Sequence, residues 1–176
     1  MVSLFPSDGA PRPAIAAGMA IGRYLQRNHP QARQTLQPLS LYQIKDTMVL
    51  EESTIVNLEL LRTIMTGHRR GSLLGLLDQT VTAMGARTLR RWVQFPLLDL
   101  DTIHQRQDAV EALQEDTISR SELREQLRNV YDLERLCGRV QAGVASPKDL
   151  GALRASIQRI PSILAYLEGL GAPRLK

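Results

Sequence analysis

The sequence predicts a mainly α-helical protein: a bundle of short antiparallel helices with one small two-stranded β element near residues 39–50. From Glu51 onward, apolar residues recur three or four positions apart, which is the spacing of one face of an α-helix. The stretches between these periodic segments are short, as is usual in helix bundles. Between Leu36 and Leu50, apolar residues instead cluster on both sides of Lys45-Asp46, which indicates two short strands joined by a turn.

The N-terminal part contains segments of different character. Residues 1–13 carry Pro and Gly among small polar residues and predict a flexible lead-in. Residues 14–27 are rich in Ala and predict one helix, which ends before Pro30. Because the composition changes between residues 35 and 50, we expect one domain to end there and another to begin.

Residues that cap helix N-termini mark the later helices. A Ser, Thr or Asp at this position accepts a hydrogen bond from a backbone N–H that the first turn leaves unpaired. Ser146 is the clearest predicted N-cap, because Pro147 stands at the first helical position and Asp149, an acid, at the third. Pro161 is expected to kink or interrupt the helix that follows, before Ile163. The other predicted caps are Ser72, Thr82, and Asp99 or Asp101.

Several residues receive a structural rather than a chemical interpretation. Asp132 and Glu134 stand where acids in the first turn of a helix favour its dipole. Gly85, one turn before Leu89, is interpreted as permitting close helix packing. Cys137 is the single cysteine, which excludes an internal disulfide and a Cys-based zinc site, and it is interpreted as a small buried hydrophobe on a helix.

Charge and hydropathy narrow the class of protein. The net charge of +4 comes from 22 basic and 18 acidic residues, and only three of the basic residues are lysines. No segment is densely basic, so composition does not favour tight direct binding to DNA. The longest run free of polar side chains, residues 14–21, is far too short to cross a membrane, and no secretion signal is recognisable. We therefore expect a cytoplasmic protein with no membrane segment.

The sequence predicts no catalytic, cofactor-binding or metal-binding residues. None of the three lysines stands in the Gly-Lys-Ser/Thr motif that an ATP-binding phosphate loop needs. The three histidines lie far apart and show none of the paired spacings of metal ligands. Residues 67–72 imitate a phosphate loop in part, which leaves both an anion site and a plain turn between helices open.

One group of arginines is a candidate binding site. Arg87, Arg90 and Arg91 lie on overlapping faces of one predicted helix. They could contact the DNA backbone or another domain, or they could be paired with acids inside the fold. The sequence leaves these alternatives open.

Several motifs together resemble the MutS family of DNA mismatch-repair ATPases. The longest is the run at residues 71–97, GSLLGLLDQTVTAMGARTLRRWVQFPL. It is reinforced by NLEL (57–60), IHQRQDAV (103–110), YDLERL (131–136) and PKDL (147–150). The resemblance spans residues 36–160. It implies that residues 14–38 are the C-terminal piece of a connector domain, and that residues 39–176 are the N-terminal part of a helical core, or lever, domain.

The departures from the family pattern are equally informative. The family's mismatch reader uses a Phe-x-Glu motif, whereas Phe5 and Phe95 are each followed by Pro. The motif of the family's ATP site is absent as well. The resemblance therefore implies a fragment whose parent binds ATP and Mg²⁺, although this chain is expected to hold no cofactor. The expected partners are the remaining domains of the parent, double-stranded DNA through the parent, and a second parent subunit in a dimer.

Three hypotheses about function follow. The first is a non-catalytic scaffold that couples the ATPase domain of the parent to its DNA-binding clamp and mismatch-reading domains. The second is a free-standing helical adaptor that binds protein or nucleic acid through its arginine-rich helix. The third is an enzyme whose site is assembled from distant side chains, and no motif supports this hypothesis.

Overall fold

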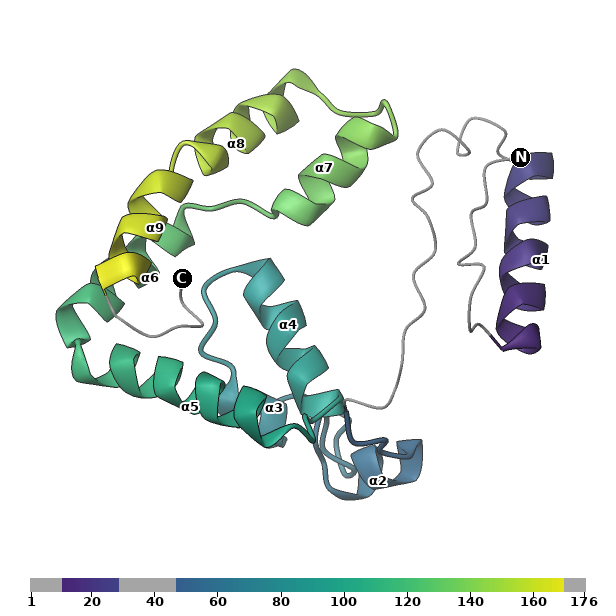
Figure 1. The fold of residues 1–176 in the computed structure, drawn as a ribbon, viewed down its shortest axis with the longest axis horizontal. Coiled ribbons are helices and arrows are strands. Elements are labelled where there is room, and N and C mark those ends of the chain that lie inside the picture. The colour runs from purple at the N-terminus through teal and green to yellow at the C-terminus, as the bar shows by residue number, and fades with distance from the viewer. Residues whose placement is uncertain (1–10, 29–46, 170–176) are drawn as a thin grey trace. The chain divides into compact units, whose positions relative to one another are not determined.

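The computed structural model describes residues 11–28 and 47–169 of the chain (Figure 1). These residues fall into two compact units. The first contains residues 11–28 and 138–144, and the second contains residues 47–137 and 145–169. The helices are α1 (Arg12–Asn28), α2 (Glu52–Asn57), α3 (Leu73–Leu77), α4 (Ala83–Gln94), α5 (Leu100–Glu115), α6 (Thr117–Arg128), α7 (Leu133–Gln141), α8 (Pro147–Ile157) and α9 (Ile160–Gly169). The prediction of a mainly helical protein is confirmed.

Helix α1 confirms the helix predicted for residues 14–27. It begins two residues earlier, at Arg12, because the carbonyl of Pro11 accepts the N–H groups of Ala14 at 2.9 Å and Ile15 at 3.2 Å. Pro13 fits in the first turn, where its missing N–H costs no helical hydrogen bond. The predicted lead-in lies largely outside the described residues.

The predicted N-caps are confirmed. The side chains of Ser72, Thr82 and Asp99 each accept a backbone N–H three residues further on. Ser146 forms the complete capping box, because its hydroxyl accepts the Asp149 N–H and the Asp149 carboxylate accepts the Ser146 N–H at 2.7 Å. A break is present near Pro161, but it lies earlier than predicted: α8 ends at Ile157, and Ile160 and Pro161 begin α9, where a proline fits in the first turn.

One helix boundary was not predicted. The apolar pattern continues from α5 into α6, but Asp116 ends the first helix and caps the second by accepting the N–H of Ser119 at 2.9 Å. Hydrogen bonds from Ser119 hold the pKa of the Asp116 carboxyl below its ordinary value. Hydrogen bonds from Thr102 lower the pKa of Asp99 in the same way. These two carboxylates are therefore explained by capping.

The predicted two-stranded β element is not found in the part of the chain that the structure describes. Thr47 forms an isolated antiparallel bridge with Leu97, and the Met48 N–H donates to the Pro96 carbonyl at 2.7 Å. The prediction is wrong for residues 47–50, because their partner is the extended segment after α4, where Pro96 prevents the helix from continuing. Residues 39–46 lie outside the described residues.

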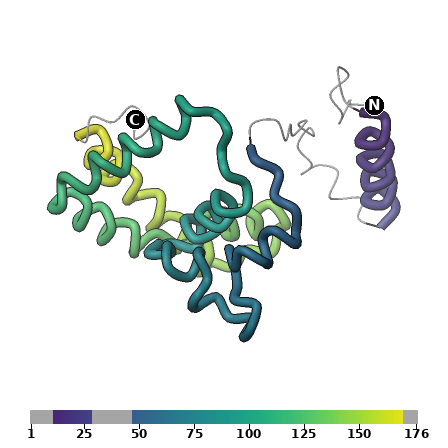
Figure 2. Tube along the Cα trace, turned by 90° about the horizontal axis from the view of Figure 1, so that it is seen from below, coloured from purple at the N-terminus to yellow at the C-terminus, as the bar shows by residue number. Residues whose placement is uncertain are grey.

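The helices of the second unit pack in pairs, some adjacent in the sequence and some distant. Helix α6 packs against α5 and α9, and α3 packs against α4 (Figures 1 and 2). The guanidinium of Arg106 on α5 lies 3.8 Å from the ring centre of Trp92 on α4, which adds a cation–π contact. Ser156 on α8 is fully buried and accepts the N–H of Tyr131 at 3.0 Å, which ties α8 to the segment before α7.

The buried core of the described residues is small. Its hydrophobic members are Leu60, Leu74, Ala109, Leu123 and Leu136. Many large apolar side chains are exposed instead, among them Leu76 and Ile118 at 75% and 74%. Cys137 lies on α7 as predicted, but it is exposed, so its interpretation as a buried residue is wrong. A helix has an outer face as well as an inner one, and spacing alone did not identify which face carries Cys137.

Candidate arginine site on helix α4

Helix α4 places two of the three candidate arginines in different surroundings. Thr82 begins the helix by accepting the Gly85 N–H at 3.0 Å. A side chain at Gly85 would meet the Thr82 hydroxyl at 3.0 Å and Thr80 at 3.5 Å. Gly85 therefore makes room for the capping turn before α4 rather than for another helix, which corrects its predicted role. Arg87 and Arg90 then follow three residues apart on α4.

Arg87 is held by two carboxylates at the start of α7. Its Nη1 and Nη2 donate to Asp132 Oδ2 and Oδ1 at 2.8 and 2.7 Å. Its Nε and Nη2 donate to Glu134 Oε2 at 3.0 and 2.6 Å. This two-pronged geometry is the strongest form of an arginine–carboxylate contact. Of the alternatives for Arg87, the structure shows pairing inside the fold.

The electrostatics of this cluster follow from the hydrogen bonds. The Arg87 guanidinium holds the pKa of Asp132 at about 2, below its ordinary range. The hydrogen bonds that Arg87 donates to Asp132 and Glu134 raise the pKa of Arg87 further above its already high value. Asp132 and Arg87 are therefore both charged at neutral pH. Solvent screens the cluster, because 49% of the Arg87 side chain is exposed.

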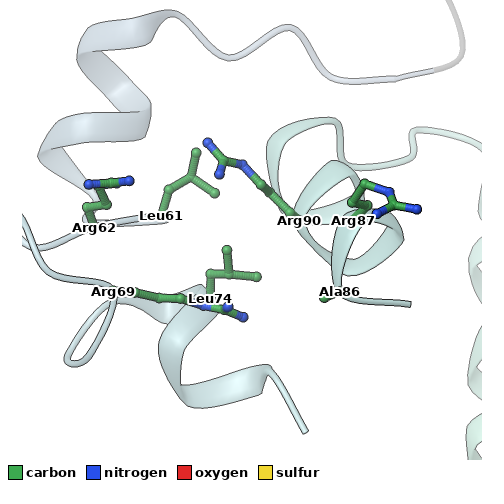
Figure 3. A pocket seen from close by; sticks show the side chains of 7 residues that line it. All are labelled: Leu61, Arg62, Arg69, Leu74, Ala86, Arg87 and Arg90. Atoms are coloured by element: carbon green, nitrogen blue, oxygen red, sulfur yellow. The ribbon is translucent and has the colours of Figure 1, made fainter. Parts of the chain in front are cut away.

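Arg90 and Arg87 both line an open pocket of about 230 Å³ beside α4. Its lining residues are Leu61, Arg62, Arg69, Leu74, Ala86, Arg87 and Arg90 (Figure 3). We call this pocket the arginine recess. Four of its seven lining residues are arginines, and none is acidic. Arg69 forms an ion pair with Asp78, whose other oxygen accepts the Thr80 N–H at 2.9 Å.

Backbone contacts hold the far wall of the recess in place. The N–H groups of Leu73 and Leu74 donate to the carbonyls of Glu59 and Leu60 at 3.1 and 2.8 Å. A side chain on Gly75 would stand 2.1 Å from the Arg69 carbonyl oxygen, so α3 packs directly on the backbone that carries Arg69. These contacts join α3 to the segment that carries Arg62.

Sequence reasoning found part of this site. Arg90 and Arg91 were singled out, and both are exposed on α4. Arg62 was missed, since a lone arginine in a loop carries no sequence signal. The partnership of Arg87 with Asp132 was missed because the two residues are 45 positions apart. Residues 67–72 form the turn before α3, where Ser72 caps the helix and Arg69 enters the recess.

The described residues contain neither a metal-binding cluster nor a membrane-spanning helix. No group of three or more His, Cys, Asp or Glu side chains is arranged to hold a metal ion there. Within the same residues, no helix is both long and apolar enough to span a membrane. Tyr166 has a raised pKa because of the nearby charge of Glu122. The arginine-rich pocket beside α4 is suited to binding an anion.

A match to a known family model assigns this chain to a protein family. Residues 53–176 match the family model of MutS domain III. The chain belongs to this family. The described helices α2 to α9 lie almost wholly within the matched residues. The resemblance carried by the motifs is thereby confirmed.

The MutS domain III match agrees with whole-protein relatives, each named DNA mismatch repair protein MutS. The chain is 44% identical to the protein of Myxococcus xanthus, over 99% of this chain and 20% of that protein. It is 47% identical to that of Symbiobacterium thermophilum, over 91% of this chain and 18% of that protein. It is 44% identical to that of an Exiguobacterium strain, over 87% of this chain and 18% of that protein. The chain spans about a fifth of the length of these curated relatives.

Proposed function

We propose that this chain is a non-catalytic scaffold within a MutS-type mismatch repair protein. In this proposal, its helices couple an ATPase domain to the DNA-binding clamp and mismatch-reading domains of the parent. The parent would act as a dimer on double-stranded DNA in the cytoplasm, with ATP and Mg²⁺ bound outside this chain. The family match supports this assignment, because the chain matches the family model of domain III and about a fifth of each relative.

The observation that carries the proposal is the Arg87 cluster. A force on α4 reaches α7 through four hydrogen bonds from one guanidinium to Asp132 and Glu134. The two helices are separated by α5 and α6 in the sequence, so the contact links distant segments of the chain. Coupling between sites requires contacts that link the segments concerned, and the Arg87 cluster is such a contact.

The domain boundaries belong to the same proposal. Residues 14–38 are proposed to end a connector domain, and residues 39–176 to begin the helical core. The separation of α1 from α2 to α6 into different compact units supports a boundary between residues 28 and 47. Arg91 remains a proposed contact with DNA or with another domain.

The proposal can be tested in a chimera in which this chain replaces the matching segment of the Myxococcus xanthus relative. ATP hydrolysis is measured with and without duplex DNA, for the unchanged chimera and for Arg87→Gln. We expect Arg87→Gln to reduce the DNA-dependent change in hydrolysis several-fold, while hydrolysis without DNA stays near its original rate. Arg154→Gln, which removes the same charge from an exposed position on α8, is the control.

Two results would contradict the scaffold proposal. One is full DNA dependence in the Arg87→Gln chimera at normal DNA affinity. The other is ATP hydrolysis by the 176-residue chain alone that a substitution within the chain abolishes. The second result would instead favour an enzyme with a site assembled from distant side chains.

A further inference from the structure

The arginine recess gathers more positive charge than the carboxylates of the described residues neutralise. Asp78 compensates Arg69, and Asp132 with Glu134 compensates Arg87. Arg62 donates only to an uncharged acceptor, the Gly67 carbonyl, at 3.3 Å. Arg90 has no polar partner among the described residues. Two uncompensated guanidinium groups therefore line one recess that contains no carboxylate.

These two side chains are directed at the same space. In Figure 3 the guanidinium groups of Arg62 and Arg90 extend toward one another from opposite walls, with Leu61 between them. The Arg87 guanidinium points away from Arg62 and Arg90, as its hydrogen bonds to Asp132 and Glu134 require, whereas Arg69 reaches the recess below Leu74. Like charges that converge in this way repel one another, and an anion between them would remove the repulsion.

The walls of the recess are preorganised. Leu74 is 4% exposed and anchors α3, and the backbone bonds from α3 to residues 59 and 60 hold the Arg62 segment. On the other wall, the contact of Arg87 with Asp132 orients α4, which carries Arg90. A ligand would then need to order only the ends of two arginine side chains, which lowers the entropic cost of binding.

The geometry favours a phosphate group over a carboxylate. A carboxylate is planar and can accept a parallel pair of hydrogen bonds from a single guanidinium, as Asp132 accepts from Arg87. A phosphate presents oxygens in several directions and can accept from guanidinium groups that approach from opposite sides. A recess of about 230 Å³ leaves room for a phosphate group and its remaining hydration.

We propose that the arginine recess binds a phosphate group through Arg62 and Arg90, with Arg69 completing the positive wall. The phosphate comes either from a small free molecule, such as inorganic phosphate or a phosphate monoester, or from a nucleic-acid backbone. The proposal does not depend on the scaffold role, because the recess is formed entirely by residues 61–90 of this chain.

The experiment titrates the full 176-residue chain with inorganic phosphate and with pyrophosphate at constant ionic strength. Binding is followed by NMR through the side-chain Nε–Hε signals of the arginines. We expect the signals of Arg62 and Arg90 to move in a saturable manner. Arg62→Gln and Arg90→Gln should each weaken binding by about tenfold or more, since each removes a charge-assisted pair of hydrogen bonds.

Two further variants distinguish specific phosphate binding in the recess from nonspecific electrostatic attraction to the chain. Arg154→Gln removes the same charge from an exposed position on α8 and should leave the affinity within about twofold of the original. Arg90→Lys keeps the charge but loses the planar fork, so it should lie between the original chain and Arg90→Gln. Circular dichroism confirms that each variant is folded.

A short DNA duplex added to the phosphate-bound chain identifies the source of the phosphate. Displacement that requires both Arg62 and Arg90 supports a backbone phosphate, and no displacement supports a small free molecule. The proposal is overturned if phosphate binding is equal in Arg62→Gln, Arg90→Gln and Arg154→Gln. It is also overturned if phosphate and pyrophosphate fail to bind while an oligoglutamate peptide binds to the recess.

Discussion

Two regions of the second unit reach their structure by different means. The turn region, residues 52–80, contains two helices of six and five residues, and backbone bonds such as Leu74 N–H to Leu60 carbonyl connect the second helix to the segment that follows the first. The helix region, residues 82–137 and 145–169, contains longer helices whose capping residues lie beside them in the sequence. Helices of one or two turns are not stable alone, so the turn region depends on its cross-connections, whereas the helix region begins from local signals.

The turn region also carries backbone geometry that sequence periodicity does not reveal. Glu59 has a positive φ of 49°, which is unusual for a residue other than glycine. Its carboxylate accepts the Ile64 N–H at 2.7 Å, and its carbonyl accepts the Leu73 N–H. Glu59 therefore organises the turn that follows α2. The comparison indicates that the two regions should respond differently to substitution.

The largest expected effect is the destabilisation of the turn region when Gly75 is substituted. In Gly75→Ala, the new Cβ would lie 2.1 Å from the Arg69 carbonyl oxygen, which is a backbone atom. We expect the free energy of unfolding, measured by urea titration, to fall by about 3 kcal/mol, at the upper end of overpacking effects. Hydrogen exchange should show the loss of protection beginning in α2 and α3.

Gly151→Ala is the matched control for this substitution. Gly151 lies within α8, and a Cβ there has no neighbour within 4 Å. The same chemical change should therefore raise stability by about 0.5–1 kcal/mol. Equal effects of the two substitutions would contradict the contrast between the regions.

A smaller effect is expected from the cap of α8 in the helix region. Ser146→Ala removes the hydroxyl that accepts the Asp149 N–H and thus breaks the capping box. We expect a loss of about 1 kcal/mol, with hydrogen exchange increased in the first turn of α8. Ser121→Ala, at an exposed position within α6, should change stability by less than about 0.5 kcal/mol. Loss of protection throughout α2 and α3 in Ser146→Ala would show that the regions are not separable.

The smallest effect is expected from the ion pair of Arg87, because it is exposed to solvent and screened. The pKa of Asp132 is about 2 in the folded chain and about 4 when unfolded. Because the folded value is lower, the pair stabilises the fold above pH ~4, and its contribution is lost as the pH falls toward ~2. Asp132→Asn or Arg87→Gln should therefore lower the Tm at pH 6 and leave it nearly unchanged near pH 2.

Thermal unfolding of the original chain and of both variants across this pH range checks the prediction. Combining Asp132→Asn with Arg87→Gln should cost less than the sum of the two single effects, because either substitution alone already breaks the contact between these side chains. A difference in Tm between original and variant that is constant from pH 6 to pH 2 would assign the effect to packing instead.

Sequence alone anticipated the elements that depend on near neighbours. It predicted the caps Ser72, Thr82 and Ser146 and a break near Pro161, because capping chemistry and the effect of proline act within three or four residues. The family motifs are recognisable for a related reason, since each of them is a continuous run of residues. The break at Asp116 was missed because the apolar spacing continues across it.

Tertiary structure alone decided which distant residues meet. The pairing of Thr47 with Leu97, the outward position of Cys137 and the contacts of Arg87 all depend on how the chain folds back on itself. The same holds for the arginine recess, whose lining comes from three separate segments. Periodicity predicts that a helix has an apolar face, but it does not predict which segment packs against that face. The packing partner depends on how the loops bring distant segments together.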